Sequence, residues 1–435
     1  MTPDARLAAC MELTVEIEDA IAGQGPAADV LIQQYFRQRR YAGGGDRRAI
    51  TGFVYDLLRR RGELVWRLNS VGLPVDARHL CLMQQQVTAK LDASLFDGPH
   101  APDTPTEDTL NALSGALALA SPPAWAKANL PEWLADSLAQ RFGARLDDEI
   151  AALAGRAPTD IRANTLATDR DSLHKALAEA GYEAKPCRWS PWGLRLEEAH
   201  GLTGRDEFRR GLFDIQDESS QLAVLLSGVA PQMQVLELGA GGGGKTLALA
   251  AMMGNTGQIY ALDVDRRRLE EGKKRAQRAG VRNVQYHRIT SGPEKRATQL
   301  AIFNAAADVV LVDAPCSGSG AWRRNPEARW RLTPEDLTDH MDRQAALLDE
   351  ALGLVRPGGH VVYMTCSLLR QENEQIVENF LAAHPDMTVV DYRTRMAVAG
   401  LADLPTAADR PEMLQLTPAM HGTDGFFLAI LKLEA

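Results

Sequence analysis

The sequence has few cysteines and no long hydrophobic run. The five cysteines lie far apart and include no C-x-x-C pair: Cys10, Cys81, Cys187, Cys316 and Cys366. Neither a disulfide framework nor a zinc site is therefore indicated, and a cytoplasmic location is expected. No apolar stretch is long enough to span a bilayer, and residues 1–25 lack the basic start and apolar core of a secretory signal.

An overall excess of positive charge is also missing, since the net charge is −9. The basic residues are nevertheless clustered. Residues 37–67 contain nine arginines against three acidic residues, and smaller basic groups lie at 266–278 and 323–331. Such groups supply either a local phosphate-binding surface or ordinary solvated helix faces, and charge alone does not decide between them.

The 435 residues predict several domains, because about 100–200 residues per domain is usual. Apolar spacing of three and four predicts an all-helical domain over residues 1–145. A strand, a helix and two further strands predict a small α+β element over 146–228. Over 229–435, strand-length apolar runs separated by helical stretches predict a doubly wound, mostly parallel sheet: QVLELGA, QIYALDV, DVVLVDAP, GGHVVYMTC and DGFFLAILKL.

The glycine loop VLELGAGGGGKT (235–246) fits three kinds of cofactor site. It matches the phosphate-binding P-loop and the dinucleotide fingerprint, and it suits S-adenosylmethionine (SAM) equally well. Asp263, at the end of the next strand, is placed to bond ribose hydroxyls. Glu237 would oppose a triphosphate but would favour a cofactor with an amine and a sulfonium. These two carboxylates favour SAM. An NTPase stays open, because VVLVDAP resembles a magnesium-binding strand end.

Two of the cysteines follow predicted strands. Asp313 and Cys316 lie in DAPCSGSG, and Cys366 lies in TCS. In open α/β sheets the carboxyl ends of the strands line the ligand crevice, so both thiols are expected beside the glycine loop. A thiolate that adds to C6 of cytosine makes C5 nucleophilic toward a sulfonium methyl. Asp313 would hydrogen-bond the N3/N4 edge of the base, which must leave its stack. This chemistry does not rank the two cysteines.

The order of these motifs resembles the Fmu/Sun (RsmB/Nop) family of SAM-dependent RNA cytosine-5 methyltransferases. The resemblance covers nearly the whole chain. It rests on these segments: RANTL (162–166), QDESSQLA (216–223), the glycine loop, DAPCSGSG (313–320), RRNPEARW (323–330), TCSLLRQENE (365–374) and DGFF (424–427). It implies a Rossmann-like class I methyltransferase domain that follows a NusB-like helical domain and a small RNA-binding element.

The resemblance also implies roles for individual residues. Cys366 would be the nucleophile, Cys316 would assist product release, and Asp313 would hold the base. SAM would be bound by Gly239, Ala240, Gly241, Gly242, Gly243, Gly244, Lys245, Asp263 and Asp313. RNA contacts would come from Arg39, Arg40, Arg47, Arg48, Arg323 and Arg324. The expected partner is ribosomal RNA of the small subunit, bound by a monomer without metal or membrane.

Two alternatives stay open: a tRNA cytosine-5 methyltransferase, and a non-catalytic RNA-binding factor in ribosome assembly. The sequence also departs from the family pattern twice. Gly242 stands where the family usually has Pro, and Thr290 or Ser291 stands near the place of the usual adenine-contacting Asp. Glu372, Asn373 and Glu374 are expected to begin the helix after TCS, where acidic side chains suit the helix dipole.

Overall fold

The computed structural model describes residues 1–23, 25–119, 121–401 and 403–434. These residues divide into two compact units. One unit comprises Met1–Arg156 and Ala321–Pro334, and the other comprises Ala157–Gly320 and Glu335–Ala435. The inclusion of residues 321–334 in the first unit was not expected from the sequence. The predicted domain boundaries at 145 and 228 stay predictions.

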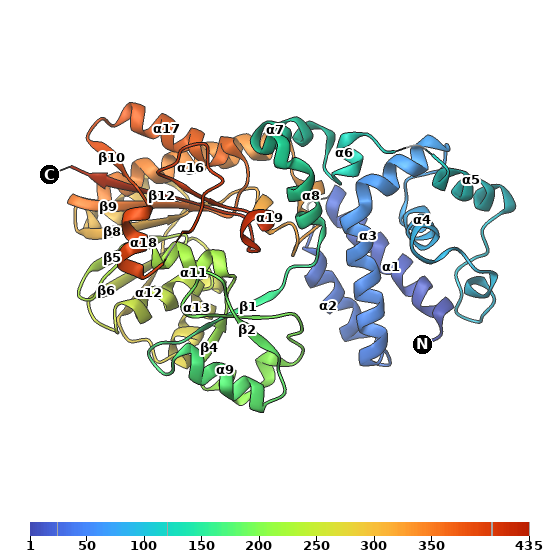
Figure 1. Cartoon of the computed structure of the whole chain (residues 1–435), viewed down its shortest axis with the longest axis horizontal. Coiled ribbons are helices and arrows are strands. Elements are labelled where there is room, and N and C mark those ends of the chain that lie inside the picture. The colour runs from blue at the N-terminus through green and yellow to red at the C-terminus, as the bar shows by residue number, and fades with distance from the viewer. Residues whose placement is uncertain (24, 120, 402, 435) are drawn as a thin grey trace. The chain divides into compact units, whose positions relative to one another are not determined.

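The first unit is helical (Figure 1). The long helix α3 packs against α1 and α4. Leu13 and Ile17 of α1 and Leu57 and Leu58 of α3 are fully buried, as the spacing of three and four predicts. The helices of this unit are α1 (Pro3–Ala22), α2 (Ala28–Gln38), α3 (Gly44–Ser70), α4 (Ala77–Ala89), α5 (Glu107–Leu117), α6 (Ala124–Lys127), α7 (Glu132–Phe142), α8 (Leu146–Ala154) and α15 (Ala328–Arg331).

Acidic and basic side chains of residues 321–334 bind this segment to the rest of the helical unit. Glu327 accepts a hydrogen bond from the backbone N–H of Ala28. The buried Arg329 donates to the carbonyls of Asn129 and Trp322. Burial lowers the pKa of the Arg329 guanidinium to about 9. Part of the basic group at 323–331 therefore stabilises the fold rather than forming an open surface.

The second unit contains two sheets. The smaller sheet is antiparallel, with the strand order β2-β3-β1-β4, and it carries helix α9 (Arg170–Glu179). This agrees with the strand and helix pattern expected after residue 160. Its strands are β1 (Thr159–Ala163), β2 (Ala184–Pro186), β3 (Gly193–Leu196) and β4 (Phe213–Ile215), and α10 (Asp206–Arg209) precedes β4.

The larger sheet has eight strands in the order β10-β12-β9-β8-β5-β6-β7, and β11 pairs with β12. β7, β6, β5, β8 and β9 are parallel neighbours, and β12 is antiparallel to β9. This is the expected Rossmann-like methyltransferase sheet. Its strands are β5 (Gln234–Leu238), β6 (Gln258–Asp263), β7 (Val284–Arg288), β8 (Ala307–Asp313), β9 (Val355–Thr365), β10 (Met387–Val390), β11 (Leu414–Leu416) and β12 (Phe426–Leu433).

Helices cover both faces of the larger sheet (Figure 1). β8 (ADVVLVD) and the second half of β9 (VVYMT) are buried along almost their whole length, so both are almost continuously apolar. No helix among the described residues has the length and apolar character that a membrane crossing requires. The helices of this part are α11 (Glu218–Leu225), α12 (Gly244–Met252), α13 (Arg266–Arg278), α14 (Pro293–Leu300), α16 (Pro334–Leu354), α17 (Glu374–Ala383), α18 (Arg393–Ala399) and α19 (Pro418–His421).

Candidate active site

The predicted site residues meet at one edge of the larger sheet. The glycine loop follows β5, Asp263 ends β6, Asp313 ends β8, and Cys366 follows β9. These four strands are parallel, so their carboxyl ends share an edge. The chain proceeds from β5 to β6 on one side and returns to β8 on the other. The glycine loop thus lies at the topological switch point, where open α/β sheets bind ligands.

The glycine loop turns tightly against the end of β8. Gly239 has a φ of +82°, and an added Cβ there would lie 2.4 Å from the Asp313 carbonyl oxygen. Only glycine tolerates both conditions. The loop is fixed on its other side by Asp263, which accepts a hydrogen bond of 2.7 Å from the Gly241 N–H. The carbonyl of Gly242, where the family usually has Pro, accepts from Arg275 at 2.6 Å.

Asp263 and Glu237 give the site its negative charge. Asp263 is buried and also accepts from the Asp265 N–H at 2.7 Å. Each of its oxygens retains a lone pair for a ribose hydroxyl. Glu237 is fully buried, and its Oε2 accepts from the Thr246 hydroxyl at 2.5 Å. Its Oε1 is buried and has no hydrogen-bond partner among the residues that the structure describes. An unsatisfied carboxylate oxygen fits a cationic cofactor such as SAM.

Burial raises the pKa of Glu237 to about 7, although the Thr246 hydroxyl and the Lys245 ammonium act in the opposite direction. Asp313 and Asp263 add to the increase, because they are like charges. The carboxyl group is therefore poised to ionise near neutral pH.

SAM affinity is expected to depend on pH through Glu237. A cationic ligand favours the ionised carboxylate, so a pKa of about 7 makes binding about tenfold weaker at pH 6 than at pH 8. Glu237→Gln should weaken binding at pH 8 and flatten the profile. Calorimetric titration with SAM across this range measures both effects, with Glu271→Gln on exposed α13 as the control. A Glu237→Gln profile as steep as that of the unmodified chain would contradict this role.

Lys245 is the second residue of α12 and forms an ion pair with Asp313. Its Nζ lies 2.7 Å from Asp313 Oδ2. Burial alone would lower the pKa of the Lys245 amine, but Asp313, with smaller contributions from Cys366 and Glu237, raises it. The sequence predicts Lys245 as a SAM-binding residue. The structure shows a further contact, because Lys245 holds the carboxylate predicted to bind the base.

The two predicted catalytic cysteines are adjacent. The Sγ atoms of Cys316 and Cys366 are 3.4 Å apart, which is far longer than a disulfide bond, and both are partly exposed. The pKa of the Cys316 thiol is raised well above its usual value, first by its hydrogen bond with Cys366, then by burial and by negative charge nearby. Cys10, Cys81 and Cys187 are buried, as expected for small hydrophobic residues.

Glu372 lies elsewhere than the sequence analysis expected. It ends a short 3-10 turn (Arg370–Glu372) before α17 and is fully buried, so its charge does not simply complement the helix dipole. Its carboxylate accepts hydrogen bonds from Ser317 and Ser367. The sequence held a signal for this, because a Cys-Ser pair occurs twice, at 316–317 and 366–367.

Thr290 follows β7 near the place of the usual adenine-contacting Asp. Its backbone N–H donates to Gln299 Oε1 at 2.9 Å. Gln299 comes from α14, which the sequence analysis did not connect with this position. The group that contacts adenine stays a prediction.

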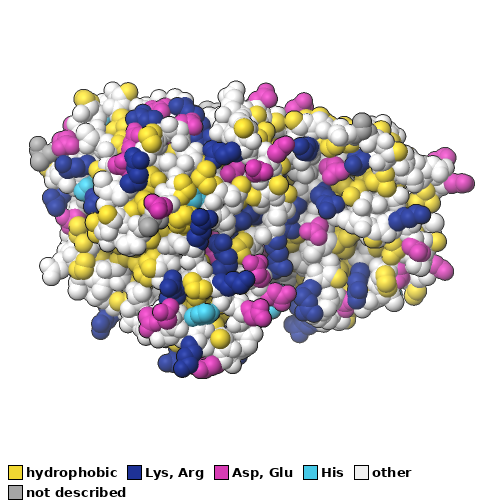
Figure 2. All heavy atoms as spheres, viewed as in Figure 1, with side chains coloured by type: hydrophobic (Ala, Val, Ile, Leu, Met, Phe, Trp, Pro, Cys, Tyr) yellow, Lys and Arg dark blue, Asp and Glu magenta, His cyan; other side chains and the backbone are white. Residues whose placement is uncertain are grey.

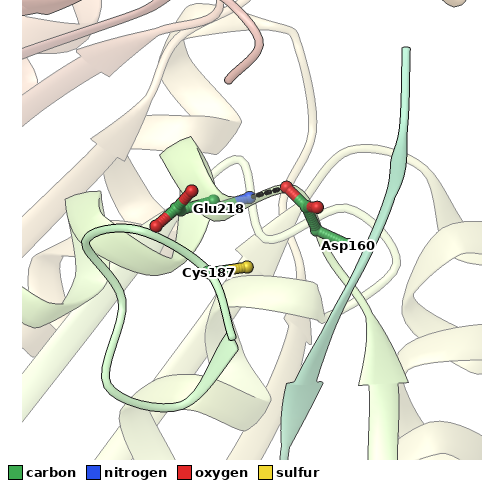
Figure 3. A group of neighbouring side chains, drawn as sticks. All are labelled: Asp160, Cys187 and Glu218. Carbon is green, nitrogen blue, oxygen red and sulfur yellow. Dashed lines mark hydrogen bonds between the residues drawn. The ribbon is translucent and has the colours of Figure 1, made fainter. Parts of the chain in front are cut away.

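A further group of possible metal ligands lies in the second unit (Figure 3). Asp160, Cys187 and Glu218 offer buried ligand atoms within 4.8 Å of one another. Arg195, however, binds Asp160 through two hydrogen bonds of 2.7 Å, and Glu218 Oε1 accepts two backbone N–H groups near Ser190. The guanidinium already supplies positive charge here, so the group is well suited to fixing the fold.

The arginines predicted to bind RNA differ in their surroundings. Arg40, Arg47 and Arg48 are exposed. Arg39 pairs with Glu12 at 2.9 Å. Arg323 is buried and Arg324 is partly exposed. On the face drawn in Figure 2, basic side chains are interspersed with acidic ones, so local groups rather than a continuous field would bind phosphate.

Comparison with known proteins identifies the family. The model for the 16S rRNA methyltransferases RsmB/F matches residues 223–432, and the model for the ferredoxin-like domain of these enzymes matches residues 130–203. A probable ribosomal RNA small subunit methyltransferase B of Synechocystis is 33% identical over 308 residues, which cover 70% of this chain and 67% of that protein. The chain belongs to the RsmB/F family of 16S rRNA methyltransferases.

One further ribosomal RNA methyltransferase and two solved structures are also similar to this chain, and the second structure bears on the fold alone. The ribosomal RNA small subunit methyltransferase F of Serratia proteamaculans is 32% identical, over 66% of this chain and 59% of its own length. A methyltransferase homolog of Pyrococcus horikoshii is 30% identical with a TM-score of 0.61, over 72% of this chain and 99% of that one. The structure of PH0851 has a TM-score of 0.78 at 24% identity and covers 100% of this chain and 99% of its own.

The family and the site together identify the cofactor as S-adenosylmethionine. This agrees with the prediction from Glu237 and Asp263, and it excludes the P-loop NTPase. The matched region spans 59 to 67% of the lengths of the two ribosomal RNA methyltransferases compared.

Proposed function

We propose that this chain transfers the methyl group of SAM to C5 of a cytidine in small-subunit ribosomal RNA, through a covalent bond between Cys366 and C6. The observation that carries the proposal is the thiol pair: two sulfurs 3.4 Å apart at the edge of the sheet that carries the glycine loop. Bound SAM supplies a methyl group on a positively charged sulfur. The residues of the chain would supply the rest of the chemistry.

In the proposed reaction, the Cys366 thiolate adds to C6 and the displaced electron pair moves to C5. Asp313, held by Lys245, bonds the N3/N4 edge as the ring accepts electrons. C5 then takes the methyl group and carries both this group and its proton. Loss of that proton re-forms the C5–C6 double bond and expels the Cys366 thiolate.

Cys316 suits the removal of the C5 proton. The largest cause of its raised pKa is the hydrogen bond with Cys366. Once the Cys366 sulfur is bonded to carbon, this cause is gone, so the Cys316 thiol ionises more easily at the step that needs a base. The pair thus fits two successive roles, with Cys366 attacking first and Cys316 acting afterwards.

The test is methyl transfer from labelled SAM to RNA of a strain that lacks the protein. Naked ribosomal RNA, small-subunit particles and tRNA are assayed separately, and the products are digested to nucleosides. Label in 5-methylcytidine of small-subunit RNA is expected. Label only in tRNA would show that the substrate is tRNA instead. Transfer to none of the three would favour a non-catalytic RNA-binding protein in ribosome assembly.

We propose that the helical unit binds RNA phosphates through exposed arginines at the start of α3. Replacing Arg47 and Arg48 together by alanine should weaken RNA binding and reduce the slope of log K against log salt by about 1.4–1.8, since each phosphate contact contributes about 0.7–0.9. Fluorescence anisotropy at several salt concentrations measures this slope. Arg356→Ala with Arg393→Ala removes the same charge elsewhere, and an equal change in that control would contradict the assignment.

A further inference from the structure

The buried carboxylate of Glu372 joins the two loops that carry the thiols. Its Oε1 accepts from the Ser317 N–H at 2.8 Å and from Gln344 Nε2 at 3.1 Å. Its Oε2 accepts from the hydroxyls of Ser317 and Ser367, each at 2.5 Å. The side chain has no exposed surface. A buried carboxylate is costly unless its oxygens are bonded, and four donors meet that need here.

The two serines directly follow the two cysteines. Ser317 is the neighbour of Cys316, and Ser367 is the neighbour of Cys366. One carboxylate therefore binds the residue that follows each thiol, through the N–H and hydroxyl of Ser317 and through the hydroxyl of Ser367. A backbone hydrogen bond also joins the two loops, since the Gly320 N–H donates to the Cys366 carbonyl at 2.9 Å.

Glu372 is itself held by residues of α16 and β9. Gln344 of α16 also donates to the Pro315 carbonyl at 2.9 Å, on the residue before Cys316. Tyr363 of β9 donates to the Glu372 carbonyl at 2.6 Å. The position of the carboxylate is thus set by residues outside the two thiol loops.

Charged groups of both signs act on the thiol pair. Glu372 is among the groups that raise the pKa of Cys316, after Cys366 and burial. Cys366 is among the groups that raise the pKa of the Lys245 amine, after Asp313 has opposed the effect of burial. The Glu372 carboxylate therefore affects the charge at the pair as well as its position.

We propose that Glu372 is a positioning residue that clamps the Cys316 and Cys366 loops together through Ser317 and Ser367 and keeps the two thiols in reacting distance. The same carboxylate also contributes to the raised pKa of the Cys316 thiol. The inference deepens the proposed function and rests on it for the identity of the reaction.

The first readout is the formation of a disulfide between the two thiols, which reports their distance without RNA or SAM. Diamide takes two electrons and two protons from the pair and is reduced to the corresponding hydrazine. Glu372→Gln keeps the shape of the side chain but replaces one acceptor oxygen by a donor. It should slow disulfide formation by about tenfold, because the bond requires specific geometry. Glu378→Gln on α17, which instead removes an ion pair with Arg370, is the matched control.

The second readout is steady-state methyl transfer. Glu372→Gln should lower kcat by about 100-fold, as expected when a reacting group is misplaced by about 1 Å. KM for SAM should stay within about twofold, since Glu372 is not placed at the cofactor. Glu372→Asp, which retains the charge, should restore part of kcat. If Glu372→Gln fails to fold, Ser317→Ala and Ser367→Ala each remove one contact and should show smaller losses of the same kind.

A third readout separates position from charge. In a Cys366→Ala background, Glu372→Gln should shift the alkylation of Cys316 by iodoacetamide to lower pH. The other titratable groups beside the pair are Lys245, Asp313 and Tyr363, and they are unchanged in this comparison.

The proposal would be overturned if a folded Glu372→Gln variant kept both its rate of disulfide formation and its kcat within about twofold of the unmodified chain. If the unmodified chain forms the disulfide quickly and Glu372→Gln does not, but no RNA is methylated, the clamp stands and the proposed function fails. The two failures are therefore distinguishable.

Discussion

Cys366→Ala is expected to lower the rate of methyl transfer by roughly 10⁴-fold or more, as the loss of a catalytic nucleophile does in other enzymes. Without the sulfur, no group is left to add to C6, and C5 of an intact cytosine is a poor nucleophile. Cys316 does not replace it, because burial and the Glu372 carboxylate still raise the pKa of its thiol when the Cys366 sulfur is absent. Single-turnover transfer from labelled SAM measures the loss.

The same variant should bind SAM within about twofold of the unmodified chain, because we expect the loop after β5 and the end of β6 to form most of the cofactor site. Cys10→Ala is the control for the loss of a buried thiol that lies outside the larger sheet. Methyl transfer by Cys366→Ala within about tenfold of the normal rate would show that the attack comes from another group.

Gly239→Ala is expected to abolish most SAM binding. The new Cβ would lie 2.4 Å from the Asp313 carbonyl, at a φ of +82°. Relieving this overlap and the unfavourable backbone conformation should cost about 2–4 kcal/mol. If the loop avoids this cost by leaving the conformation that binds SAM, the affinity for SAM should be roughly 30- to 1000-fold lower.

Calorimetric titration with SAM measures this effect. Gly353→Ala is the matched control, since an added Cβ there has no heavy atom within 4 Å and the position lies in helix α16. The control should bind SAM normally. Unchanged SAM affinity in Gly239→Ala would mean that the glycine loop does not approach the cofactor as we propose.

The sequence was most informative where position along the chain determines position in space. Asp263, Asp313 and Cys366 each follow a strand-length apolar run, and parallel strands bring such residues to one edge. The order of the strands and helices was therefore enough to predict that these three residues lie close together. β7, β10 and β11 were not among the predicted runs, because VQYHR of β7 is mostly polar and runs of four and three residues carry too little periodicity.

Features that depend on tertiary contact were not accessible from the sequence. RRNPEARW contains a basic group that was expected to form either a phosphate-binding surface or a solvated helix face. In the structure, Glu327 and Arg329 bind this segment to the helical unit. Glu372 was expected at the start of a helix. Only the structure shows that it is buried and accepts hydrogen bonds from the serines beside the two thiols. Lys245 could not be paired with Asp313, because 68 residues separate them in the chain.

The most direct test of the central claim is to trap the covalent bond. Cys316→Ala is incubated with SAM and substrate RNA, and the protein–RNA adduct is isolated under denaturing conditions and mapped by mass spectrometry. The account predicts an adduct on the peptide that contains Cys366 and none when Cys366 is also replaced by alanine. An adduct on Cys316 in the Cys366→Ala variant, with none in Cys316→Ala, would contradict it, because the two thiols would then have the opposite roles.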